Sequence, residues 1–206
     1  MGINILTAII IITILLSWRA FENIEIKNKW TFSPYLVKHN QQHYRIFSHI
    51  WIHADTAHLA FNMMSLYFLG GLLQGELNLY FSPLQGQIHF TAIYLIGGLF
   101  ATIIPFYRNK DNQSYLSLGA SGAVSAVVFA AILWRPDVEL GIIFLPFHFP
   151  AVWFGIFYMG YEIWMAKRGG TGIAHDAHIG GAILGILYVL IINSSKGSEF
   201  LYYITG

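Results

Sequence analysis

Long apolar runs separated by polar or proline-containing connections dominate the sequence, and they predict a bundle of membrane-spanning helices. A helix needs about 20 mostly apolar residues to cross a hydrocarbon core of about 30 Å. Runs that approach this length recur along the chain, and we place six spans at residues 3–20, 58–74, 88–106, 115–134, 151–166 and 175–193. The pattern therefore predicts an all-α polytopic membrane protein with six transmembrane helices, in a single domain over residues 1–206.

Two connections between the spans are unusual. The first, residues 21–57, is too aromatic for a disordered segment, and loops of this length in compact proteins are usually functional or disordered. We expect it to lie on or in the membrane, shielded by protein, because irregular backbone cannot face lipid. The connector at about 137–150 contains Pro146 and Pro150, which disfavour a continuous helix.

Composition agrees with a membrane protein. Hydrophobic residues make up 56% of the chain and charged residues only 10%, whereas soluble domains carry about 25% charged residues. A soluble globular enzyme and a disordered protein are therefore excluded. The chain has no cysteine, so a disulfide framework, a thiolate nucleophile and a cysteine metal site are excluded too. No cluster of Lys and Arg resembles a nucleic-acid footprint, and we expect no nucleic-acid partner.

Polar and ionisable residues inside membrane spans are costly, and they are functional hypotheses by default. His58 and Asn62, in the second span, are four residues apart and share one face of a helix, with His49 and His53 shortly before them. Three interpretations stay open from these residues alone. They are a polar pocket with hydrogen-bond donors, a histidine site for zinc or iron, and polar groups that merely lie near an interface.

The fourth span contains the motif G-A-S-G at residues 119–122. If the span begins near residue 115, Ser121 lies roughly 9 Å below the interface at a rise of about 1.5 Å per residue. The small residues Gly119 and Gly122, followed by Ser125 and Ala126, allow another backbone to approach closely. Taken alone, the motif indicates a helix-packing seam more readily than a nucleophile.

The sixth span contains H-I-G-G-A-I-L-G at residues 178–185. His178, Gly181 and Gly185 fall on one helical face, and the glycines remove the side chains that would hold a partner helix away. A histidine on such a face can approach whatever packs against it. A buried, hydrogen-bonded structural histidine fits the same pattern.

The fourth and sixth spans together predict a serine–histidine dyad. A serine hydroxyl is a poor nucleophile until a base takes its proton, and packing of the two small-residue faces brings Ser121 toward His178. The oxyanion of a tetrahedral intermediate also needs preorganised donors, which the Ser121 backbone N–H, the Asn62 amide and the His58 ring can supply. Asp176 is two residues before His178, and side chains at that spacing on a helix do not face each other.

At this point the sequence resembles the rhomboid family of intramembrane serine proteases. The matching pieces occur in the family's order and cover almost the whole chain. They are Arg45 in Y-R-I-F-S-H, H-A-D-T-A-H-L-A-F-N at 53–62, Gly70 and Gly71, G-A-S-G at 119–122 and H-I-G-G-A-I-L-G at 178–185.

The resemblance implies a role for each matching residue. Ser121 is the nucleophile, and His178 is the general base and later the acid. His58, Asn62 and the Ser121 backbone form the oxyanion site. The remaining positions support the site: His53 lines the pocket and helps retain water, Arg45 holds the first loop, and Gly119, Gly122, Gly181 and Gly185 belong to the two helix motifs. The aromatic fifth span matches the element that flanks substrate entry, although a lipid-facing aromatic helix fits it equally.

The resemblance also implies an activity: cleavage of transmembrane or membrane-anchored polypeptides through an acyl-enzyme, in a lipid bilayer and without a metal or cofactor. Two alternatives remain. One is a catalytically silent rhomboid-like protein that binds membrane clients. The other is a histidine-ligated metalloprotein, for which Asp55 and Asp176 are the main acidic candidates.

The sequence departs from the family's pattern at three positions. Tyr44 stands where the family often has Trp, and Gln74 stands where it often has Glu. Ser125 stands where an aromatic residue often stacks on the catalytic ring. Another group must therefore orient His178, and His175 and Asp176 are the candidates.

The minimal size of the chain and the lack of a transit peptide predict a prokaryotic plasma membrane. Orientation in that membrane stays open. Residue Arg19 and the first, third and fifth connections hold nine of the eleven Lys and Arg residues, which favours a cytoplasmic first loop. The family resemblance implies the opposite orientation, with the site open to the outside.

Overall fold

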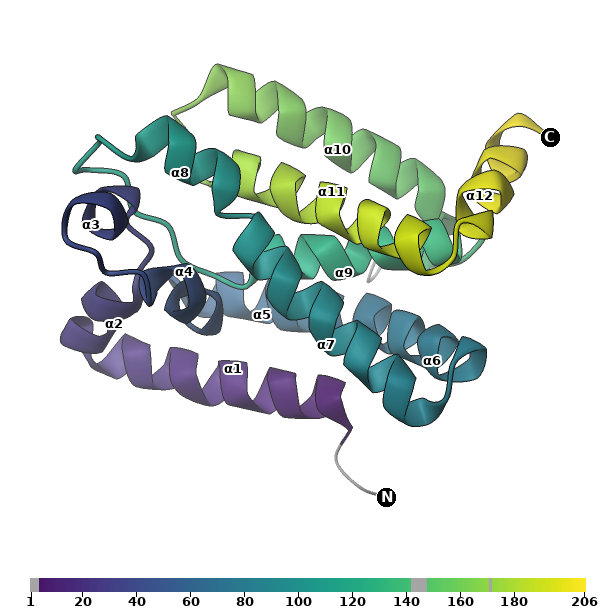
Figure 1. The fold of residues 1–206 in the computed structure, drawn as a ribbon, viewed down its shortest axis with the longest axis horizontal. Helices are drawn as coiled ribbons and strands as arrows, with labels where there is room; N and C mark the ends of the chain where they lie inside the picture. The colour runs from purple at the N-terminus through teal and green to yellow at the C-terminus, as the bar shows by residue number, and fades with distance from the viewer. Residues whose placement is uncertain (1–3, 142–147, 171) are drawn as a thin grey trace.

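The computed structural model describes residues 4–141, 148–170 and 172–206, and it shows a helical bundle (Figure 1). Its main helices are α1 (Ile5–Glu22), α5 (Thr56–Ser65), α6 (Gly71–Tyr80), α7 (Pro83–Phe100), α9 (Ser121–Trp134), α10 (Ala151–Arg168) and α11 (His175–Ile192). A π-helical segment, η2 (Leu66–Gly70), joins α5 to α6. The shorter helices are α2 (Ile24–Trp30), α3 (Pro34–His39), α4 (Arg45–Ser48), η1 (His49–Trp51), α8 (Ile103–Asn109) and α12 (Ser195–Thr205).

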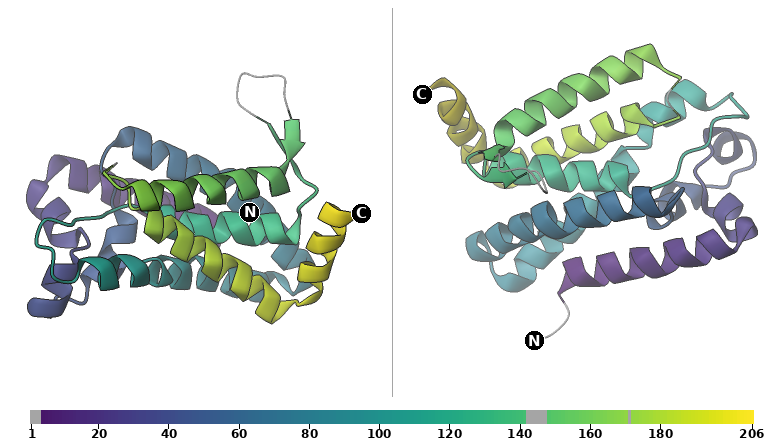
Figure 2. Two further views of the ribbon diagram at one scale, coloured as in Figure 1. Left: turned by 90° about the horizontal axis from the view of Figure 1, so that it is seen from above. Right: turned by 180° about the vertical axis from the view of Figure 1, so that it is seen from behind.

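Helix α9 forms the centre of the bundle. Its residues from Gly122 to Trp134 are all buried, and it packs against α6, α7, α10 and α11. Helices α1 and α10 lie on opposite sides of this centre (Figures 1 and 2). With 14 residues, α9 is shorter than the roughly 20 residues that a lipid-facing span needs. The surrounding helices shield both of its ends, so this length is sufficient.

Among the residues that the structure describes, four helical segments are long and apolar enough to cross a membrane: Ile5–Glu22, Thr56–Tyr80, Pro83–Asn109 and His175–Ile192. They coincide with the first, second, third and sixth predicted spans, and the prediction of an all-α polytopic membrane bundle is confirmed. The fourth and fifth predicted spans correspond to α9 and α10.

Three predicted boundaries are wrong. The third span begins at Pro83 instead of residue 88, because Ser82 caps its helix. The second span continues to Tyr80 instead of ending at residue 74, because η2 carries the helix past Gly70. The fourth span begins at Ser121 instead of residue 115. The preceding segment is held out of the helix because Ser117 exchanges two backbone hydrogen bonds with Phe32, at 2.9 and 3.0 Å. Ser121 is therefore the first residue of its helix and does not lie a turn and a half inside it.

The connections around α10 and after α11 also contain regular structure. Strands β1 (Glu139–Gly141) and β2 (His148–Pro150) form an antiparallel pair just before α10. Pro146 and the first residue of the first predicted span lie outside the described residues. The tail after α11 forms α12.

Local sequence explains where the helices that position the site begin. Asp55 caps α5, because its Oδ1 accepts the backbone N–H of His58 at 2.8 Å. Ser82 caps α7 with a reciprocal pair to Gln85, and Pro83 follows at the first helical position, where its missing N–H costs nothing.

Arg45 ties the first connection together. Its Nη1 donates to the carbonyl oxygens of Asn28 and Thr31 at 2.7 and 2.6 Å, and its Nε donates to Oε1 of Gln42 at 2.6 Å. The side chain is buried, so these bonds satisfy a guanidinium that has left water. The end of α2 and the segment just before α4 thus close around one cation, which is the geometry that a loop-holding role requires.

Candidate active site

Helices α9 and α11 touch backbone to backbone. A Cβ on Gly181 would overlap the carbonyl oxygen of Gly122, and one on Gly185 would overlap that of Ala126. A Cβ on Gly122 would meet Ala101. The glycine face of α11 therefore packs directly on the small-residue face of α9, as their motifs predict. This close packing brings the first turns of the two helices together.

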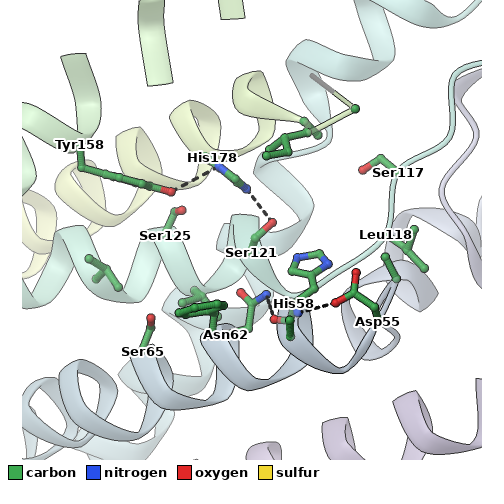
Figure 3. A pocket seen from close by; sticks show the side chains of 18 of the residues that line it. Asp55, His58, Asn62, Ser65, Ser117, Leu118, Ser121, Ser125, Tyr158 and His178 are labelled. Atoms are coloured by element: carbon green, nitrogen blue, oxygen red, sulfur yellow. Dashed lines mark hydrogen bonds between the residues drawn. The ribbon is translucent and has the colours of Figure 1, made fainter. Parts of the chain in front are cut away.

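The first turns carry Ser121 and His178. The Oγ of Ser121 lies 2.8 Å from Nε2 of His178, which is a hydrogen bond (Figure 3). Both residues line a cavity of about 630 Å³ that also reaches α5 and α10. The structure thus brings together the two residues that the motifs in the fourth and sixth spans single out.

The opposite wall of the cavity comes from α5 and presents His58 and Asn62 (Figure 3). The Nδ2 of Asn62 donates to the carbonyl oxygen of His58 at 2.9 Å, which fixes the amide and leaves its second N–H. The backbone N–H of Ser121 belongs to the first turn of α9, where N–H groups have no intrahelical acceptor and carry the positive end of the helix dipole. Donors from α5 and α9 therefore meet beside the serine oxygen.

The loop before Ser121 is positioned by two histidines of the first connection. Gly119 has φ +125°, a conformation that favours glycine, and a Cβ there would also meet the ring of His58. Its N–H donates to the carbonyl oxygen of His49 at 3.0 Å. The N–H of Ala120 donates to Nε2 of His53 at 3.2 Å. Hydrogen bonds from these two backbone N–H groups therefore fix the polypeptide immediately before the serine.

His53 does not lie where we predicted. Because its Nε2 accepts from Ala120, its proton is on Nδ1, which lies 2.9 Å from Oγ of Ser17 in α1. Ser17 in turn donates to the carbonyl oxygen of Trp51 at 3.2 Å. The imidazole is fully buried and is not among the described residues that line the cavity. It connects the serine loop to α1 from behind, instead of facing the pocket.

Burial keeps His49 and His53 neutral at physiological pH. It lowers the pKa of His49 to about 4, although the imidazole donates to the carbonyl of Arg45. Burial, with a smaller contribution from the neighbouring His58, lowers the pKa of His53 to about 3. Both folded-state values lie below the value of about 6.5 expected in the unfolded chain.

These two histidines predict a loss of stability in mild acid. Between pH 6.5 and about 4 the unfolded chain binds more protons than the folded one, so the free energy of unfolding falls as pH falls. At pH 5 we expect each histidine to cost about 2 kcal/mol relative to pH 6.5. Thermal unfolding in detergent at several pH values measures this. His49→Gln should flatten the pH dependence, whereas His43→Gln, at an exposed position, should not; an equal slope in both variants contradicts the assignment.

The other ring nitrogen of His178 faces α10. Its Nδ1 lies 3.3 Å from the Tyr158 hydroxyl and 3.1 Å from Oε1 of Glu162. Oε2 of the same carboxylate lies 2.6 Å from Nδ1 of His175. The Tyr158 ring stacks on Phe154 at 5.5 Å and is tilted 24° to the His178 ring. Ser125 cannot support the His178 ring as an aromatic side chain would, and Tyr158 and Glu162 of the fifth span support it instead.

Sequence reasoning missed Glu162. Its signal was present, because a carboxylate in an apolar span is itself a functional hypothesis. Of the two groups we named for orienting His178, His175 binds the carboxylate that contacts it. Asp176 instead faces Arg108, at 3.7 Å.

The metal alternative changes its ligand set in the structure. One atom each of Glu162, His175 and His178 lie within 4.8 Å of one another. The acidic candidates that we named are elsewhere: Asp55 caps α5 and Asp176 faces Arg108. Glu162 already accepts a hydrogen bond from Nδ1 of His175, and its other oxygen lies 3.1 Å from Nδ1 of His178, so the carboxylate has partners within the cluster without a cation.

Fold and site together define a polytopic helical membrane protein with a serine–histidine pair inside its bundle. The family model of the Rhomboid domain matches residues 40–195. The chain belongs to the rhomboid family.

Several curated proteins are similar to this chain. RHOMBOID-like protein 12, mitochondrial, of Arabidopsis thaliana is 32% identical over 181 residues, which cover 82% of this chain and 52% of that protein. Presenilin-associated rhomboid-like protein, mitochondrial, is 33% identical over 139 residues in both Bos taurus and Homo sapiens, covering 66% of this chain and 35% of each relative. The chain thus spans about half the length, or less, of these relatives.

The relatives correct one prediction. Those matched over most of this chain are named as mitochondrial proteins. The predicted location in a prokaryotic plasma membrane is therefore wrong. That prediction depended on the size of the chain and on its first residues, and these do not identify the membrane. Integration into a membrane remains supported by the apolar helices.

Proposed function

We propose that this chain is an intramembrane serine protease that cleaves transmembrane or membrane-anchored polypeptides. The observation that carries the proposal is the 2.8 Å contact between Oγ of Ser121 and Nε2 of His178 at the wall of a large cavity. A serine hydroxyl bound to an imidazole that is itself held from behind is the arrangement of an activated nucleophile. Membership of the rhomboid family supports the same activity.

The reaction follows from the atoms at the site. Oγ of Ser121 attacks the scissile carbonyl carbon while Nε2 of His178 takes the hydroxyl proton. The C–N bond of the tetrahedral intermediate then breaks, and the same proton passes to the leaving amine. In the second half, His178 takes a proton from water, and the resulting hydroxide attacks the acyl carbon. The bond from that carbon to Oγ of Ser121 then breaks, and His178 returns the proton to Oγ. Each step uses residues of the chain, and none requires a metal or cofactor.

The donors around Ser121 form the oxyanion site in this proposal. Ser121, Asn62 and His58 all line the cavity, and in this proposal the Ser121 backbone N–H, the second N–H of Asn62 and the His58 ring donate to the oxyanion. They are fixed before substrate arrives, by the helix start of α9 and by the Asn62–His58 bond. Donors of this kind each contribute about 10²–10³ in rate, because they are aimed at charge that develops only in the transition state.

The cavity favours an unwound segment of a membrane polypeptide. Its wall combines the polar groups of the site with apolar side chains such as Val124, Val128 and Phe154. A peptide bond within a helix is shielded by the surrounding turns and has its carbonyl engaged in a backbone hydrogen bond. Cleavage therefore requires the substrate to unwind locally before its carbonyl reaches Ser121.

A fluorophosphonate probe tests the proposal. Purified protein in detergent is treated with the probe, and the modified residue is mapped by mass spectrometry. We expect labelling at Ser121, with His178→Ala protein unlabelled under the same conditions, because only an activated serine reacts with the phosphorus centre. If folded protein stays unlabelled while a soluble serine hydrolase in the same sample reacts, the proposal fails and client binding without proteolysis becomes the better explanation.

A further inference from the structure

The cluster behind His178 has a geometry that a serine–histidine dyad does not require. It consists of Tyr158 and Glu162, one turn apart on α10, and His175 and His178, one turn apart on α11. Glu162 lies at its centre with both carboxylate oxygens engaged, one by each histidine. We propose that Glu162 is a positioning residue for His178 and completes a Ser121–His178–Glu162 triad; this inference rests on the proposed function.

The groups that contact Nδ1 of His178 determine which tautomer its ring adopts. For Nε2 to take the Ser121 proton, the ring proton must be on Nδ1. The Tyr158 hydroxyl either donates or accepts, so at 3.3 Å it is compatible with both tautomers. An ionised carboxylate only accepts, so Oε1 of Glu162, 3.1 Å from Nδ1, favours the tautomer with the proton on Nδ1. Of these two neighbours, Glu162 alone selects the tautomer that makes His178 a base toward Ser121.

His175 fixes the orientation of the Glu162 carboxylate. Glu162 is 3% exposed and His175 is equally buried. A buried carboxylate is stable only when it is paired and hydrogen-bonded. The 2.6 Å bond from Nδ1 of His175 to Oε2 fixes one oxygen and thereby directs the other toward His178. His175 therefore supports Glu162, and Glu162 supports His178.

The Glu162 carboxylate also stabilises the positive charge that His178 gains in the proposed reaction. When His178 accepts the serine proton it becomes an imidazolium whose side chain is largely buried. A carboxylate at its far nitrogen stabilises that cation without rearrangement, and such stabilisation is larger inside a protein than in water. The same contact holds the ring at the angle at which Nε2 meets Oγ of Ser121. Ser125 offers no aromatic surface for this task, and the carboxylate performs it from the neighbouring helix.

Glu162→Gln tests the inference, because it keeps the shape and removes the charge. We expect the maximal rate of fluorophosphonate labelling at Ser121 to fall by about 10²–10⁴-fold, with little change in the probe concentration at half-saturation. Glu162→Asp, which retains the charge, should recover a substantial part of the rate. Glu76→Gln is the matched control: it removes another ion-paired carboxylate, bound to Arg135 at 2.7 Å, and leaves the site intact. We expect its labelling rate to stay within about threefold of the parent chain's.

A spectroscopic readout separates positioning from general structural support. In protein labelled with ¹⁵N-histidine, the parent chain should show His178 with the proton on Nδ1, and Glu162→Gln should shift it toward Nε2, because the glutamine amide donates. An unchanged tautomer with an unchanged labelling rate overturns the inference. If Glu162→Gln does not fold, His175→Asn decides instead. This variant should slow labelling at Ser121, and an unchanged rate in folded protein again overturns the inference.

The experiment also distinguishes this inference from the proposed function. If the parent chain is not labelled at Ser121, the protease assignment itself fails. If the parent chain and Glu162→Gln are labelled equally, the assignment survives and only the triad fails. A labelling rate of the parent chain that falls when a chelator is added assigns the same three side chains to a metal, and this too overturns the triad.

Discussion

Ser121→Ala should lower cleavage of a membrane-anchored substrate, the reaction we propose, by at least about 10⁴-fold. In that reaction the substitution removes the oxygen that forms the acyl-enzyme, and His178 then has no hydroxyl to activate. The donors on α5 and the first turn of α9 remain, so substrate is still bound and its carbonyl still polarised. Residual hydrolysis by water is the only activity expected. The fold should persist, because the Oγ is a small group at the wall of a cavity.

The measurement uses protein in liposomes with a fluorescent transmembrane peptide, and it reports both cleavage and the amount of inserted protein. Ser198→Ala is the matched control, because this serine lies exposed in α12, where its hydroxyl bonds only within its own helix. Its cleavage rate should equal that of the parent chain. Turnover by Ser121→Ala at the parental rate, in correctly inserted protein, is incompatible with a serine protease centred on this residue.

The sequence predicts the components of the site that depend on local pattern. Gly181 and Gly185 follow His178 at helical spacing, so their shared face is visible without a structure. The same holds for His58 and Asn62. Long apolar runs likewise place most of the spans, because hydrophobic length is a local property. What these patterns have in common is that all the residues they relate lie within one helix.

Features that depend on contacts between distant segments were not predictable in this way. The start of α9 is set by Phe32, which is far from Ser117 in the chain and pairs with it through backbone alone. The role of His53 depends equally on Ala120 and Ser17, which lie in two other elements. Glu162 is different, because its burial cost was visible in the sequence but its partners on α11 were not.

Gly181→Ala should lower both stability and activity, because it places a methyl group where the carbonyl oxygen of Gly122 lies. A backbone atom cannot rotate away as a side chain can, so α11 must move off α9. Overpacking of this kind costs about 1–3 kcal/mol and occasionally more. The contact between Ser121 and His178 spans the same two helices, and a misplacement of about 1 Å at a reacting pair costs about 10²-fold in rate.

Gly160→Ala is the matched control, and its expected effect has the opposite sign. This glycine also lies within a helix, α10, but a Cβ there meets no atom within 4 Å. Alanine is the better helix former by about 1 kcal/mol, so the variant should melt no lower than the parent chain and should keep its labelling rate. Thermal unfolding in detergent and fluorophosphonate labelling measure the two variants side by side. Equal behaviour of both would mean that α9 and α11 are not in contact at Gly181. The proximity of serine and histidine would then need another origin, because the α9–α11 contact is what brings their first turns together.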